Sequence, residues 1–157
     1  MIGGLEPVVL DTNVLVHLVR ANAVGKKIAD SFGLRTRRER PLISIVTAGE
    51  LRSLALKLNW GDARRLVLDK LVGELVVVQL NQGDILDRYA RIDAYSERSA
   101  RPARRMEKND IWIAATASAV GGPLLTTDGD FEHLPTELLK WIRVSATTGE
   151  VLATNLA

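Results

Sequence analysis

The sequence predicts an α/β fold in three layers, with helices on both faces of a central, mainly parallel sheet of four to five short strands. Short apolar runs alternate along the chain with segments of helical periodicity. Most of the runs are apolar at successive positions, as strands are when both faces of a parallel sheet are buried. The length of 157 residues suits a single domain, with a core over about residues 7–144 and a C-terminal tail over 145–157.

The first half of the chain is predicted to form two strands and three helices. The strands are the apolar runs at residues 7–10 and 41–46. The helices are the segments with apolar residues three or four positions apart. They begin after Asp11, at Thr47 and at Asp62, and the first of them is broken near Gly25.

The second half is predicted to contain strands at residues 75–80, 124–127 and 141–144. Helical periodicity covers 84–97 and 109–120, and the second of these helices is followed by two glycines and a proline that end it. In open parallel sheets a ligand binds beyond the carboxyl ends of the strands. Residues that directly follow strands are therefore the first candidates for a functional site.

The composition excludes several classes of protein. The chain has no cysteine, so it has no disulfides, thiolate metal ligands or cysteine nucleophile. No apolar run approaches the ~18 residues of a membrane span, and the first residues lack the pattern of a signal peptide. We expect a cytoplasmic protein that does not bind membranes.

Positive charge is concentrated in two arginine-rich segments. Residues 35–40 carry a net charge of +3 and residues 98–108 carry +4, so the rest of the chain carries −5 although the total is only +2. Such segments either bind a polyanion or form solvated surface. The candidates for contact with a polyanion in the second segment are Arg98, Arg101, Arg104, Arg105 and Lys108.

Four acidic residues lie at or near the predicted carboxyl ends of strands or the starts of the helices that follow: Asp11, Glu50, Asp110 and Asp128. Three of them have a stated structural alternative, since Glu50 has the capping-box spacing from Thr47, Asp110 suits the positive end of a helix dipole, and Asp128 suits a turn. Four carboxylates in one crevice repel unless cations neutralise them. Oxygen ligands alone favour Mg²⁺ or Mn²⁺ over zinc.

Three segments and one residue carry a resemblance to the PIN-domain ribonucleases. They are Val8–Asn13, Glu50, Asn109–Ala115 and Leu124–Phe131, and the length is similar to that of the VapC-type toxins of bacterial toxin–antitoxin pairs. The resemblance implies a PIN-like fold and places the catalytic, metal-binding carboxylates at Asp11, Glu50, Asp110 and Asp128. It places polar supporting residues at Thr12, Asn13 and Thr126. Asp130 either assists a second metal or fixes the turn before Phe131.

The resemblance also implies an activity and partners. It implies an endoribonuclease that depends on Mg²⁺ or Mn²⁺, cleaves transfer, ribosomal or messenger RNA, forms a homodimer and is neutralised by a small antitoxin protein. Two alternatives are a PIN ribonuclease that processes RNA without being a toxin, and a non-catalytic RNA-binding or scaffold domain on the same fold.

Other enzymes that use carboxylates or phosphate loops do not fit the residues. A phosphoaspartyl phosphatase of the haloacid-dehalogenase kind needs an aspartate at position 13, where this chain has Asn13. A receiver domain needs one after the third strand, where Asn81 lies, and a Walker loop ending at Lys26 would need a glycine in place of Arg20. His17 and His133 are expected to be ordinary polar residues, and the three tryptophans to be structural.

Overall fold

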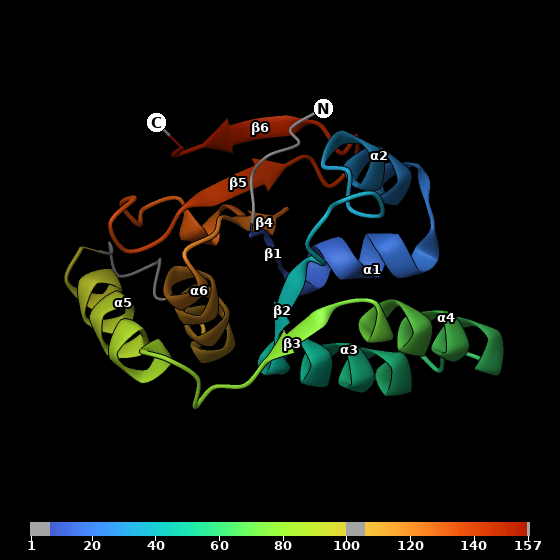
Figure 1. The fold of residues 1–157 in the computed structure, drawn as a ribbon, viewed down its shortest axis with the longest axis horizontal. Coiled ribbons are helices and arrows are strands. Elements are labelled where there is room, and N and C mark those ends of the chain that lie inside the picture. The colour runs from blue at the N-terminus through green and yellow to red at the C-terminus, as the bar shows by residue number, and fades with distance from the viewer. Residues whose placement is uncertain (1–6, 100–105, 157) are drawn as a thin grey trace.

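The computed structural model describes residues 7–99 and 106–156, which are arranged around one sheet in the order β3-β2-β1-β4-β5-β6 (Figure 1). Its strands are β1 (Val9–Leu10), β2 (Leu42–Ser44), β3 (Val76–Val78), β4 (Leu124–Thr126), β5 (Trp141–Val144) and β6 (Val151–Thr154). The first five strands are parallel and β6 is antiparallel to β5. The mainly parallel sheet is therefore confirmed, with six strands rather than the four or five expected.

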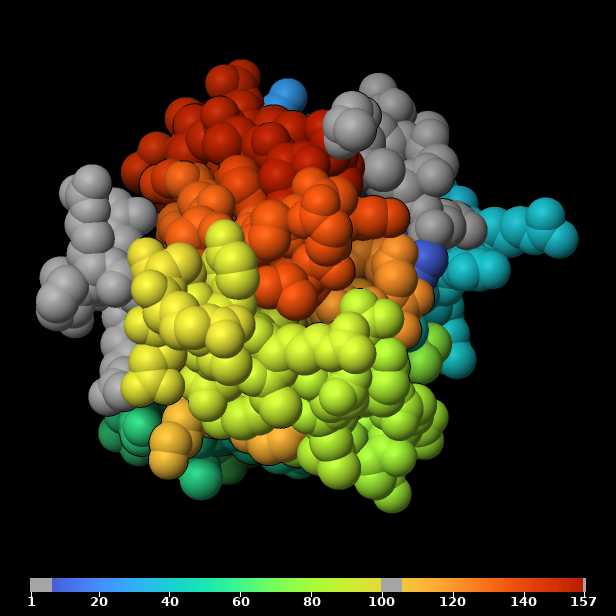
Figure 2. All heavy atoms as spheres, turned by 90° about the vertical axis from the view of Figure 1, so that its left-hand side faces the viewer, coloured from blue at the N-terminus to red at the C-terminus, as the bar shows by residue number. Residues whose placement is uncertain are grey.

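Helices cover both faces of the sheet, as predicted. One group is α1 (Thr12–Arg20), α2 (Ala23–Ser31), α3 (Ile45–Lys57) and α4 (Asp62–Gly73); the other is α5 (Ile85–Ser99) and α6 (Lys108–Val120). Figure 1 shows the two groups on opposite sides of the strands. Figure 2 shows that α5 covers much of the face seen there, below the C-terminal strands and their loops.

The core has two parts because neighbouring strand residues point to opposite faces of the sheet. Leu10 and Leu125 pack with the first group of helices, whereas Val9 and Leu124 pack with α5 and α6. All four side chains are fully buried. This double burial explains why the strands are apolar at successive positions, and it fixes the carboxyl ends of β1 and β4 side by side.

The first predicted helix is broken at a different place than expected. Helix α1 ends at Arg20 with Ala21 in the left-handed conformation, and Asn22 caps α2 by accepting a 2.8 Å hydrogen bond from the backbone N–H of Gly25. Gly25 itself lies inside α2, where a Cβ atom would overlap the backbone carbonyl of His17. The glycine thus permits close packing of α1 on α2 and is not a break.

Helix α3 begins at Ile45, two residues earlier than predicted. The hydroxyl of Ser44 accepts a 3.1 Å hydrogen bond from the backbone N–H of Val46 and caps the helix. The apolar residues at 45 and 46, predicted as strand, therefore form the first turn of the helix. In α4, Leu68 is buried in the core whereas Leu66, two positions earlier, is 70% exposed.

The segment after Ser145, expected to be a tail, contributes β6 to the sheet. The hydroxyl of Ser145 accepts hydrogen bonds from the backbone N–H groups of Thr147 and Thr148, both 3.1 Å long. Gly149 then adopts a φ of 79°, which completes the reversal toward β6. In the described part of the chain, no helix is long and apolar enough to cross a membrane.

Candidate active site

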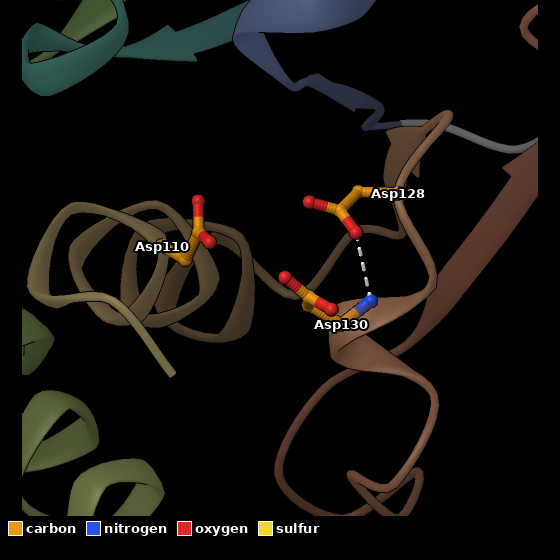
Figure 3. A group of neighbouring side chains, drawn as sticks. All are labelled: Asp110, Asp128 and Asp130. Atoms are coloured by element: carbon orange, nitrogen blue, oxygen red, sulfur yellow. Dashed lines mark hydrogen bonds between the residues drawn. The ribbon is translucent and has the colours of Figure 1, made fainter. Parts of the chain in front are cut away.

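Three aspartates from two elements bring carboxylate oxygens together at the carboxyl edge of the sheet. Asp110 lies in the first turn of α6, Asp128 follows β4, and Asp130 lies in a short 3-10 turn, η2 (Gly129–Phe131). One oxygen from each lies within 4.8 Å of the others. Figure 3 shows the three side chains around a common space. We call this group the carboxylate cluster.

The loop that carries two of these aspartates is held by its own hydrogen bonds. The Thr126 hydroxyl accepts a 2.9 Å bond from the backbone N–H of Asp128, and an oxygen of Asp128 accepts a 3.0 Å bond from the backbone N–H of Asp130 (Figure 3). Asp128 therefore caps the turn and also belongs to the cluster. The expected turn and the expected cluster are compatible.

Asp11 lies next to the cluster, at the end of β1, and is only 3% exposed. Its carboxylate accepts hydrogen bonds from the Thr126 hydroxyl at 2.7 Å, the Asn13 amide at 3.1 Å and the backbone N–H of Thr12 at 2.8 Å. Burial raises the pKa of Asp11 to about 6, and the bond from Thr126 opposes that rise. Asp11 thus links β1, α1 and β4 while adding negative charge beside the cluster.

Glu50 reaches the site from α3. Its Oε1 accepts a 2.6 Å hydrogen bond from the Thr12 hydroxyl, and its Oε2 accepts a 3.4 Å bond from the Asn109 amide. Because Ser44 caps α3, Glu50 lies in the second turn of that helix and the capping-box alternative is wrong. Thr47 lies within 3.3 Å of the Thr12 hydroxyl and completes this polar contact.

The three predicted supporting residues connect the carboxylates to the backbone. Thr12 binds Glu50, and Thr126 binds Asp11, as described above. The oxygen of Asn13 accepts a 3.0 Å hydrogen bond from the backbone N–H of Thr127, while its amide binds Asp11. The structure therefore places Thr12, Asn13 and Thr126 between the carboxylates that they were expected to support.

The electrostatics of the site centre on Asp110. Partial burial raises its pKa to about 7, and the negative charges of Asp11, Asp128, Glu50 and Asp130 add to this effect, in that order. A divalent cation among the oxygens would relieve the repulsion. The cluster offers one carboxylate oxygen from each of three aspartates, which suits a hard ion such as Mg²⁺ or Mn²⁺.

Arg143, which the sequence analysis did not identify, supports the loop of the cluster from β5. Its Nη1 donates a 2.8 Å hydrogen bond to Glu132, and its guanidinium lies against Gly129, where a Cβ atom would be 3.2 Å from Nη1. Its Nε is buried without a hydrogen-bond partner. The only sequence signal is a lone arginine in an apolar strand, which by itself does not indicate proximity to a site.

The other candidates lie in different surroundings. Arg98 is near the end of α5 and Lys108 begins α6, next to Asp110, whereas Arg101, Arg104 and Arg105 lie outside the described residues. Both histidines hold neighbouring elements. A ring nitrogen of His17 is 3.0 Å from the Asn22 amide and one of His133 is 3.0 Å from the Ser96 hydroxyl.

The tryptophans also fit structural roles. Trp60 and Trp141 are buried, and the indole N–H of Trp141 donates a hydrogen bond to the backbone carbonyl of Leu134. Trp112 packs against Tyr89, with 3.9 Å between the ring centroids. The tryptophans therefore lie in the packing, as expected, while the acidic and polar residues gather at the candidate site.

Comparisons with known proteins agree with this geometry. Residues 8–137 match the PIN domain family. Ribonuclease VapC5 of Mycobacterium tuberculosis (strain ATCC 25618 / H37Rv) is 30% identical over 128 residues, which span 80% of this chain and 86% of that protein.

Two solved structures illustrate the similarity of fold. A chain of the VapBC-5 toxin–antitoxin structure from Mycobacterium tuberculosis has a TM-score of 0.64 and 26% identity, over 88% of this chain and 98% of that chain. A chain of Rickettsia felis VapBC2, bound to a DNA fragment from its promoter, has a TM-score of 0.69 and 18% identity, over 85% and 97% of the two chains.

Proposed function

This chain belongs to the PIN domain family, and from that membership and its similarity to a VapC ribonuclease we propose that it is an endoribonuclease and the toxin of a toxin–antitoxin pair. The observation that carries the proposal is the convergence of Asp110, Asp128 and Asp130 beside Asp11. Such an arrangement of oxygens fits the binding of a divalent metal and the cleavage of a phosphodiester.

Asp110, Asp128 and Asp130 would hold Mg²⁺ or Mn²⁺, with Asp11 and Glu50 as further ligands, directly or through water. When bound, the metal supplies a water of lowered pKa and neutralises charge on the leaving oxygen. The raised pKa of Asp110 supports this assignment, because mutual repulsion contributes to it.

Polar side chains of the protein hold the carboxylates of the site in defined orientations. Thr126 and Asn13 fix the direction of the Asp11 carboxylate, and Thr12 fixes Glu50 through its 2.6 Å hydrogen bond. Glu50, held by Thr12 and Asn109, would either bind the metal or accept a proton from the attacking water. Hydrogen bonds that hold the ligands are what metal sites need for a defined geometry.

Several structures of similar fold, including those of VapBC-1 from nontypeable Haemophilus influenzae and the two VapBC structures above, come from toxin–antitoxin systems. We therefore propose that this chain binds a small antitoxin and forms a homodimer. An arginine or lysine of the antitoxin would enter the carboxylate cluster in place of the metal, since a guanidinium pairs with two carboxylate oxygens at once. A complex with the partner far from Asp110 and Asp128 would contradict this mode of inhibition.

The test is a cleavage assay with highly purified protein and single-stranded, transfer and ribosomal RNA. We expect cleavage with Mg²⁺ or Mn²⁺ that stops when a chelator is added, and no cleavage by Asp128→Asn. Undiminished cleavage in chelator would contradict the metal assignment. Binding of RNA without cleavage under any of these conditions would favour the non-catalytic alternative.

A further inference from the structure

Two adjoining hollows form a continuous groove that leaves the carboxylate cluster along α3. The first, of about 450 Å³, is lined by Glu50, Glu107, Lys108, Asn109 and Asp110. The second, of about 490 Å³, is lined by Val46, Gly49, Glu50, Ser53, Leu54, Lys57 and Asn109. Glu50 and Asn109 line both hollows, so the two are parts of one surface feature. We call it the α3 groove.

Two small residues, Gly49 and Ser53, leave room in this groove. Gly49, Ser53 and Lys57 follow one another at intervals of four residues and therefore share a face of α3. Nothing lies within 4 Å of the position that a Cβ atom of Gly49 would occupy. A larger residue at position 49 would therefore project into the groove next to Glu50 without disturbing the core.

A lysine lies at each end of the groove, but only the far end, at Lys57, is free of neighbouring acidic residues in the lining. Lys108 lies at the near end beside Glu107, Glu50 and Asp110, so that end is acidic. Both lysines are exposed. Glu50 and Lys57 are seven positions apart, which corresponds to a rise of about 10 Å along the helix, or about three nucleotides of a stacked strand.

We propose that the α3 groove binds the RNA strand on one side of the scissile phosphate and that Lys57 contacts a phosphate about three nucleotides away. The inference rests on the proposed ribonuclease function, because a phosphate at the cluster is what brings the flanking strand to the groove. Asn109 and Ser53 offer hydrogen bonds along the path, and Val46 and Leu54 offer apolar surface to bases. The far hollow thus offers one cationic group, polar groups and apolar surface to a single strand, and the acidic near end would accept a phosphate only with a bound cation.

Charge at the far end is tested by Lys57→Ala, with Arg52→Ala as the matched control on another face of the same helix. The probe is a labelled single-stranded RNA of twelve nucleotides, bound by both variants in an Asp128→Asn background that prevents cleavage. Loss of one phosphate contact should weaken binding about fivefold at 100 mM salt and lower the slope of log K against log salt by about 0.7. Arg52→Ala should change neither quantity.

Space in the groove is tested by Gly49→Leu, with Gly73→Leu as its control. Gly73 lies at the end of α4 and also has nothing within 4 Å of a Cβ atom, so both variants add the same side chain to an open helical position. Gly49→Leu should abolish binding of the twelve-nucleotide RNA, whereas Gly73→Leu should bind it as the parent does. Both should melt no lower than the parent, since leucine favours helix more than glycine does.

The results separate this inference from the proposed function. If the parent cleaves RNA but Lys57→Ala and Gly49→Leu bind it like their controls, the groove is not an RNA site and the ribonuclease proposal stands. If the same two variants change self-association or partner binding while RNA binding is unchanged, the groove is a protein contact and the inference is overturned. If the parent neither binds nor cleaves RNA, both proposals fail.

Discussion

The Thr126 hydroxyl donates a 2.7 Å hydrogen bond to the Asp11 carboxylate and so joins β4 to β1 at the edge of the sheet where the carboxylates lie. The same hydroxyl accepts a bond from the backbone N–H of Asp128. Because Thr126 is buried, no solvent competes for these bonds. One side chain thus couples the buried carboxylate of the first strand to the loop that carries the cluster.

Replacing Thr126 with valine keeps the shape of the side chain and removes both hydrogen bonds. We expect a loss of about 1–3 kcal/mol in the free energy of unfolding, because polar groups of Asp11 and Asp128 lose a buried partner. The pKa of Asp11, already raised to about 6, should rise further. The loss of stability should therefore be larger at pH 8, where Asp11 must ionise, than at pH 5. Denaturant unfolding at the two pH values measures this.

Thr116→Val is the control for that experiment. Thr116 is equally buried, and its hydroxyl donates only to the backbone carbonyl of Trp112 within α6. Its effect on stability should not depend on pH. If the two variants show the same pH dependence, the bond from Thr126 does not act through the ionisation of Asp11.

Asp110→Asn separates a metal ligand from a helix cap. The folded-state pKa of Asp110 is raised to about 7 from an ordinary value of 3.8, so the metal-free folded protein binds more protons than the unfolded chain and loses stability as the pH rises from about 4 to 7. The variant lacks this charge. Without metal it should melt no lower than the parent at pH 7, with a flatter pH dependence, and it should lose RNA cleavage.

Mg²⁺ should also stabilise Asp110→Asn less than the parent, because stabilisation by a ligand follows its affinity for the folded state. Melting curves with and without Mg²⁺, beside a cleavage assay, measure both effects. A variant that cleaves RNA at the parent rate and melts earlier would show that Asp110 serves only the helix dipole.

The sequence predicted the layers of the fold because burial leaves a direct pattern. Strands covered on both faces are apolar at successive positions, and α6 ends at a glycine with a φ of 81°. The C-terminal strand was missed because β6 lies at the edge of the sheet with Val151 and Leu152 exposed. Such a strand forms because it pairs with its neighbour, and that pairing leaves no pattern in the local sequence.

The acidic residues of the site could be proposed from their places after strands. Which of them form the tight cluster and which are held by hydrogen bonds could not be predicted. Asp130 joins Asp110 and Asp128 in the tight cluster, whereas Asp11 is engaged by Thr126, Asn13 and the backbone of Thr12. That distinction depends on contacts that only the fold creates, such as the bond between Asp11 and Thr126, which are 115 positions apart, and the approach of Asp110 to Asp128. The contact of Arg143 with Gly129 is non-local in the same way.

The arginine-rich segment gives a separate prediction about affinity for RNA. Replacing Arg101, Arg104 and Arg105 together with alanine should weaken RNA binding and flatten its dependence on salt, since fewer counterions are released. A salt titration of binding measures this. Replacing Arg35, Arg38 and Arg40 removes the same charge from the other basic segment, and comparing the two variants shows which segment contacts RNA. Unchanged affinity in the first variant would mean that its segment is solvated surface.

Arg143 is expected to position the metal ligands on the loop after β4. Its guanidinium contacts Gly129, between Asp128 and Asp130, and pairs with Glu132 just beyond them. Arg88 offers a matched comparison, because it makes a 2.9 Å ion pair with Asp84 and its side chain is 30% exposed, against 35% for Arg143. Arg88 also binds Ser118, on α6, and is not part of the carboxylate cluster.

Arg143→Met and Arg88→Met should therefore differ in metal binding although each removes a partly exposed ion pair. Each should lower the free energy of unfolding without metal by about 0–1 kcal/mol, as exposed pairs do. Only Arg143→Met should need more Mg²⁺ or Mn²⁺ for half-maximal RNA cleavage, with activity restored at high metal concentration, because the loop of Asp128 and Asp130 loses its support. Arg143→Lys keeps the charge but loses the planar contact to Gly129. The metal concentration that it needs should therefore lie between those of Arg88→Met and Arg143→Met. If Arg143→Met needs no more metal than the parent, Arg143 forms only an ion pair and does not position the metal ligands.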